Sequence, residues 1–114
     1  LLVVYLDVIG KTYEDLLKQG QTPVFVVAFR GPTLRFITRE NWSFSIEDQE
    51  RIERASSLIE QLLEHGVKFE ACSIAANLFK VDPKTYLPGI KPVGNTFVSL
   101  IGYQAKGYSL VPVD

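Results

Sequence analysis

Hydrophobic positions divide the first half of the chain into a strand pattern and a helix pattern. Residues 24–29 form a continuous apolar run that stops at the Arg-Gly-Pro of residues 30–32. Such a run is typical of a strand buried on both faces, as in a parallel sheet. Residues 45–65 instead show helical spacing, with Ser45 as an N-cap and Gly66 as a stop. The apolar positions of this predicted helix are Ile52, Ala55, Ile59, Leu62 and Leu63.

The second half of the chain predicts shorter elements in the same alternation. Apolar and polar residues alternate at 67–71, which is the period of a strand. Pro112 suggests an edge or terminal position for the last strand. The predicted elements are a strand at 67–71, a helix near 73–79, a helical segment from Pro83 to Leu87, a strand at 90–93, a helix from Asn95 or Thr96 to about Lys106, and a strand at 108–113.

The first twenty residues fit two interpretations. Leu1 to Val8 is rich in β-branched residues and fits a strand. Apolar residues in the same stretch also recur at helical spacing. We favour a helix ending at Lys18, with Gly10 as the main objection. A helix at the start implies a preceding strand upstream of this chain.

Helices and strands therefore alternate along the chain, with connections too long for hairpins. This order is typical of crossover units, which build a mainly parallel sheet between two layers of helices. We predict a three-layer α/β fold in a single domain over residues 1–114, since no linker or repeat divides the chain.

Composition excludes several classes of function. The net charge of −1 argues against a nucleic-acid binder, and the apolar run from Leu1 to Leu6 is too short to cross a membrane. The single cysteine and single histidine argue against an intramolecular disulfide or a metal site. No phosphate-binding glycine motif is present, so no cofactor is expected and a flavin-binding domain is the weakest hypothesis. The chain lacks an initiating Met; the cytoplasm is the preferred location, and an exported form stays open.

Cys72 is the first candidate for chemistry. It lies where the predicted strand at 67–71 passes into the predicted helix near 73–79. The partial positive charge at a helix N-terminus favours the thiolate, which is the nucleophilic form of cysteine. The alternative is an inert cysteine that fills a gap in the core, as lone cysteines often do.

Three further polar residues are expected near Cys72. Ligands bind beyond the carboxyl ends of the strands in open α/β sheets, and Arg30, Ser73 and Asn95 follow predicted strands. Arg30 could lower the thiol pKa or hold an anion, or it is a surface arginine in a turn. Ser73 could support a thiolate, or it caps a helix. Asn95 is a binding candidate or a cap residue.

Short motifs with a consistent order connect these elements to a known family. They are Arg30-Gly31 after the strand at 24–29, Gly66-Val67-x-Phe69-x-x-Cys72, Leu87-Pro88-Gly89-Ile90 with Val93, and Gln104-x-x-Gly107-Tyr108. In these motifs residues 24–114 resemble the DsrE/DsrF-like sulfur-relay family.

This resemblance implies a flavodoxin-like fold with a mainly parallel sheet, and a homo- or hetero-oligomer. It also implies that the cysteine matching Cys72 accepts sulfur as a persulfide and passes it to a partner protein. Many members of the family have no established activity. The sequence therefore leaves two hypotheses: a sulfur carrier with donor and acceptor proteins, or a non-catalytic oligomeric module with a packed cysteine.

Overall fold

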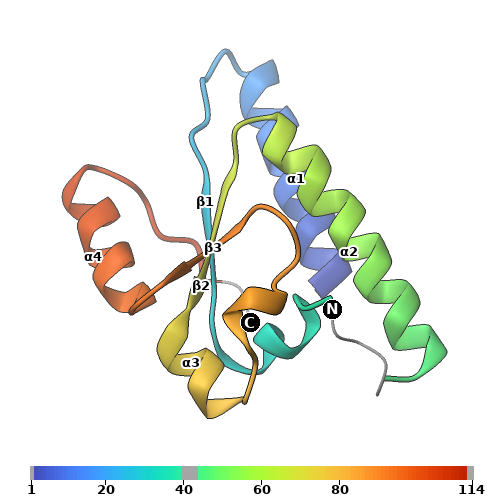
Figure 1. The fold of residues 1–114 in the computed structure, drawn as a ribbon. Coiled ribbons are helices and arrows are strands. Elements are labelled where there is room, and N and C mark those ends of the chain that lie inside the picture. The colour runs from blue at the N-terminus through green and yellow to red at the C-terminus, as the bar shows by residue number, and fades with distance from the viewer. Residues whose placement is uncertain (1, 40–43, 113–114) are drawn as a thin grey trace.

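The structure is a computed structural model that describes residues 2–39 and 44–112. Three strands form one sheet, and helices lie on both of its sides (Figure 1). In chain order the elements are α1 (Leu2–Lys18), β1 (Val26–Phe29), the 3-10 helix η1 (Gly31–Phe36), α2 (Ile46–Glu64), β2 (Lys68–Cys72), α3 (Ser73–Leu78), the 3-10 helix η2 (Pro83–Thr85), β3 (Ile90–Val93) and α4 (Thr96–Ala105).

The sheet is parallel and has the order β1-β2-β3. Ala71 of the central strand lies between Phe29 and Pro92 in register, and Cys72 lies opposite Val93. Because all three strands run the same way, their carboxyl ends share one edge of the sheet. The predicted α/β fold with a parallel sheet is confirmed.

The two faces of the sheet are covered unequally. Helices α1 and α2 contact each other on one side of the sheet, whereas α4 contacts β1 and β2 on the other (Figure 1). Phe69 is 2% exposed and stacks on Phe29, with ring centroids 5.8 Å apart. Only Thr96 is buried among the residues of α4. Apolar side chains that α4 leaves exposed are Phe97, Val98 and Ile101.

Local signals explain why the predicted helices form. The Ser45 hydroxyl accepts the Asp48 N–H at 3.1 Å, which caps α2 as expected. The N-terminal residues are helical, and Leu6 is buried. Gly10 fits within α1 because it faces α2: an added Cβ would lie 3.8 Å from the Leu62 side chain, an ordinary contact.

Four expectations need correction or stay outside the described residues. The strand predicted at 108–113 is absent over residues 108–112, where the backbone shows no pairing that would hold a strand. Strand β1 is shorter than predicted, and only Phe29 in it is buried because β1 is an edge strand. The helical segment from Pro83 ends at Thr85 rather than Leu87. The end of the predicted last strand, Val113, lies outside the described residues.

Candidate functional site

Cys72 ends the central strand and precedes the next helix. It is the last residue of β2 and the N-cap of α3, with φ −77° and ψ 121°. Side chains alternate between the faces of a strand, so Cys72 shares a face with Glu70 and not with Phe69. The residue is 6% exposed, so the sulfur lies at the margin of the core.

Hydrogen-bond donors from two helices surround the Cys72 sulfur. Burial alone raises the pKa of this thiol, because a thiolate loses its hydration in the interior. Backbone N–H groups of Thr96, Ala75 and Ile74 and the Thr96 hydroxyl face the sulfur and together lower the thiol pKa by more than burial raises it, although the Cys72 side chain makes no cap hydrogen bond to α3. The pKa of Cys72 therefore lies below its ordinary value, and the thiolate is favoured.

The donors are positioned by the starts of α3 and α4. Asn95 is the N-cap of α4, and its Oδ1 accepts the Phe97 N–H at 2.9 Å. This bond orients the first turn of α4, in which Thr96 is 1% exposed. Both helices direct free N–H groups, with their partial positive charge, at one sulfur.

The other residues predicted for the site lie around this centre. The Arg30 guanidinium lies 4.5 Å from the centroid of the Phe97 ring, so it stacks on the first turn of α4. Ser73 is the first residue of α3 and is partly buried. The structure thus places Arg30, Ser73 and Asn95 at the edge that carries Cys72. Their support of a thiolate stays a prediction.

Sequence reasoning gave Thr96 only the role of a cap, and it assigned no role to Tyr86. Tyr86 is 5% exposed, and its hydroxyl has no hydrogen-bond partner among the described residues. Burial raises the pKa of Tyr86, and the negative charge of the Cys72 thiolate raises it further. This coupling joins residues 14 positions apart, and the local sequence contains no signal for it.

Glu70 is a buried carboxylate on the same face of β2 as Cys72. It is 7% exposed, although its place between apolar residues predicts only an alternating strand. The Tyr103 hydroxyl of α4 donates to Glu70 Oε2 at 2.9 Å, whereas Oε1 has no partner among the described residues. A buried carboxylate oxygen without a donor is costly, so this atom calls for a physical explanation.

The Tyr103 hydroxyl bond should contribute measurably to stability. In Tyr103→Phe Glu70 Oε2 loses its donor, so that neither oxygen of this buried carboxylate is bound by a described residue, and we expect a loss of about 1–3 kcal/mol of unfolding free energy in urea at neutral pH. The bond to Glu70, then burial and the charges of Glu70 and Tyr108, raise the pKa of Tyr103. The contribution should therefore persist below the ordinary tyrosine pKa and disappear as the pH rises through the raised value.

Tyr108→Phe is the matched control, because the Tyr103 and Tyr108 rings are in contact with centroids 5.0 Å apart. It alters the same aromatic pair but leaves the Glu70 bond intact. Equal losses in the two variants would contradict the expectation.

Similarity to known proteins extends over most of the chain. Residues 11–113 match the DsrE/DsrF-like family. The chain belongs to this family. The match begins within α1 and includes all four of the predicted site residues, Arg30, Cys72, Ser73 and Asn95.

One relative of this DsrE/DsrF-like chain is an uncharacterized protein of Aquifex aeolicus (strain VF5). The two are 31% identical over 108 residues, which cover 94% of this chain and 48% of the relative. The chain therefore spans about half the length of that protein. Since the relative is uncharacterized, the similarity supports the family and assigns no activity.

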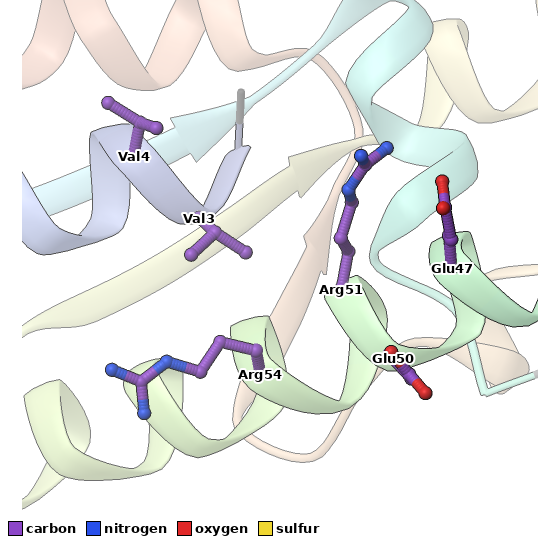
Figure 2. A pocket seen from close by; sticks show the side chains of 6 residues that line it. All are labelled: Val3, Val4, Glu47, Glu50, Arg51 and Arg54. Carbon is purple, nitrogen blue, oxygen red and sulfur yellow. The ribbon is translucent and has the colours of Figure 1, made fainter.

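A surface groove of this DsrE/DsrF-like domain lies away from the predicted site residues. Figure 2 shows two valines of α1 on one side and charged side chains of α2 on the other. The groove is wide open, and Cys72 does not line it. Its lining residues are Val3, Val4, Glu47, Glu50, Arg51 and Arg54. None of the four predicted site residues, Arg30, Cys72, Ser73 and Asn95, lines this groove.

Residues 2–39 and 44–112 contain no group of three or more His, Cys, Asp or Glu side chains that could hold a metal ion. Within the same ranges no helix is long and apolar enough to span a membrane.

Proposed function

We propose that Cys72 carries sulfane sulfur as a persulfide in a sulfur relay. One observation carries the proposal: Cys72 is nine-tenths buried where the starts of α3 and α4 meet, and the N–H groups and the Thr96 hydroxyl found there lower its pKa despite burial. An inert filler cysteine needs no such set of donors. The family, some of whose members transfer sulfur, supports the same role.

The chemistry needs neither a metal nor a net oxidant. The Cys72 thiolate attacks the outer sulfur of a donor persulfide or polysulfide, a new S–S bond forms, and the old one breaks. The electron pair of the broken bond leaves with the donor thiolate. In the second step an acceptor thiolate attacks the outer sulfur, and Cys72 leaves as a thiolate. The donors around the sulfur stabilise this leaving group.

Access to the sulfur requires a local opening. Cys72 is 6% exposed, which is less than a protein acceptor needs. Helix α3 has only six residues, and so short a helix has little stability of its own. Opening of α3 would expose the sulfur without unfolding the sheet, and it would leave the Thr96 N–H and hydroxyl of α4 to stabilise the leaving thiolate.

The second candidate function is an oligomeric binding or assembly module with a packed, unreactive Cys72. The low exposure of Cys72 favours it, as do the exposed apolar residues of α4, Phe97, Val98 and Ile101. Such a surface fits a contact between copies of the chain, and a homo-oligomer is compatible with both functions. Only the sulfur-carrier function also requires a sulfur donor protein and a sulfur acceptor protein.

Alkylation as a function of pH separates the two functions. The rate of Cys72 reaction with iodoacetamide should rise through a midpoint below the ordinary thiol pKa, because the thiolate is stabilised. Intact mass spectrometry after treatment with polysulfide should then show one added sulfur, absent in Cys72→Ala. A midpoint at or above the ordinary value, together with no added sulfur, would refute the carrier and support the module.

A further inference from the structure

Glu70 and Cys72 lie two residues apart on one face of β2, beneath one helix. Two residues of a strand span about 6.6 Å, and successive side chains on a face point the same way. Thr96 at the start of α4 lies against the Cys72 sulfur, and Tyr103, two residues before the end of α4, donates to Glu70. A single helix thus fixes both groups.

Glu70 Oε1 has the properties of an unused hydrogen-bond acceptor. The side chain is more than nine-tenths buried, its other oxygen is already bound by Tyr103, and Oε1 has no partner among the described residues. Rigidly held polar atoms of this kind are kept at a cost in stability. The acceptor faces the same layer of the molecule as the sulfur.

We infer that Glu70 is a catalytic residue whose Oε1 accepts a hydrogen bond from the outer S–H of the Cys72 persulfide. An S–S bond of about 2.05 Å extends the reacting atom beyond Sγ, and the three-carbon glutamate stem reaches from the neighbouring position on the face. This role rests on the proposed function. The two sulfurs of the persulfide are then stabilised by different groups. Helix N–H groups stabilise the inner sulfur as a leaving thiolate, and Glu70 keeps the outer sulfur protonated.

Protonation of the outer sulfur matters because an uncharged sulfur is attacked more readily by an anionic nucleophile. A thiolate attacks the outer sulfur, the S–S bond to Cys72 breaks, and its electron pair leaves on Cys72. The proton stays on the transferred sulfur, so the product is a persulfide of the acceptor and no oxidant is needed. With cyanide the product is thiocyanate, and the proton passes to Glu70 or water.

The other charged groups on this face of the sheet are cations, which favour the ionised form of the outer sulfur. Alternation and register place Lys68 of β2 and Lys91 of β3 on the face of Glu70, and α4 adds Lys106, which lies 5.9 Å from the Tyr103 ring centroid. Arg30 stacks on α4 at the strand edge. Lys68 lies four residues from Cys72, about 13 Å along the strand, so Lys91 and the strand-edge Arg30 are the cations that would stabilise an anionic outer sulfur, and the Glu70 carboxylate is the group that opposes its ionisation.

Glu70→Gln tests the role with little change in shape, because the amide oxygen can still accept the Tyr103 hydroxyl. Wild type, Glu70→Gln and the exposed control Glu64→Gln are loaded with polysulfide, and thiocyanate release from cyanide is followed from pH 6 to 10. We expect transfer from Glu70→Gln to be about tenfold slower at neutral pH, the effect of losing one charge-assisted hydrogen bond. Its decline at high pH should begin at a lower pH than in wild type, because the outer sulfur ionises more easily.

Two results overturn the inference, and they are distinguishable. If wild type loads sulfur and Glu70→Gln matches it in rate and pH profile, Glu70 has no such role while the carrier function stands. If wild type takes up no sulfur on Cys72, the carrier function fails, and the role of Glu70 fails with it. A purely structural role of Glu70 would change the urea midpoint and leave the pH profile of loaded protein unchanged.

Discussion

Replacing Thr96 with valine should slow the reaction of Cys72 with iodoacetamide about tenfold at neutral pH. Valine keeps the shape of the 1% exposed threonine and removes the hydroxyl that donates to the sulfur. A hydrogen bond to a charged group contributes about 1.5–3 kcal/mol, and 1.4 kcal/mol corresponds to a factor of ten. The pKa of Cys72 should rise, so the pH midpoint of alkylation should rise with it.

Stability gives a second readout of the same donors. A thiol pKa lowered by folding contributes stability that is present above the unfolded value and is lost as the pH falls through the folded value. The increase in unfolding free energy with pH across that window should be smaller in Thr96→Val. Thr12→Val is the matched control, since its hydroxyl bonds the Val8 carbonyl within α1 at 2.8 Å. A Thr96→Val protein with the wild-type alkylation profile would contradict the assignment of donors.

Replacing Gly89 with alanine should destabilise the fold by about 2–5 kcal/mol in urea unfolding. Gly89 has φ +91°, a conformation that L side chains rarely adopt. An added Cβ would also overlap the Leu63 side chain at the end of α2. Backbone strain and overpacking act together here, just before β3 begins.

Gly20→Ala isolates the strain, because Gly20 has φ +80° but nothing within 4 Å of an added Cβ. It should lose about 1–2 kcal/mol. Adding Leu63→Ala to Gly89→Ala should remove the overlap, so the double variant should be more stable than the sum of the single losses predicts. Equal losses at Gly20 and Gly89 would show that the Leu63 contact has no effect.

Sequence signals that extend over only a few residues were sufficient to predict most of the helices and strands. Ser45 and Gly66 bracket α2, the strand at 90–93 matches β3, and the helix start at Asn95 is an observed cap. The resemblance to the DsrE/DsrF-like family also rested on local motifs. Gly89 belongs to one of them, and its positive φ beside Leu63 gives that motif a physical reason.

Expectations that depended on distant neighbours were less successful. The segment at 108–112 has strand-forming residues, yet a strand needs a paired neighbour, and Leu110 and Val111 are exposed. The apolar run ending at Phe29 predicted burial on both faces, but β1 is an edge strand. Glu70 alternates with apolar residues like any solvent-facing position, and α4 buries it.

The sequence by itself determined the order of helices and strands, the parallel α/β class, the family, and Cys72 as the residue to examine. Caps, periodicity and glycine conformations act over a few positions, so a single chain reveals them. Only the tertiary structure decided the surroundings of the sulfur. The groups that lower the pKa of Cys72 come from residues 74–75 and from Thr96. Glu70, the proposed acceptor for the outer sulfur of the persulfide, is bound by Tyr103. These segments meet because the sheet brings the starts of α3 and α4 to one edge.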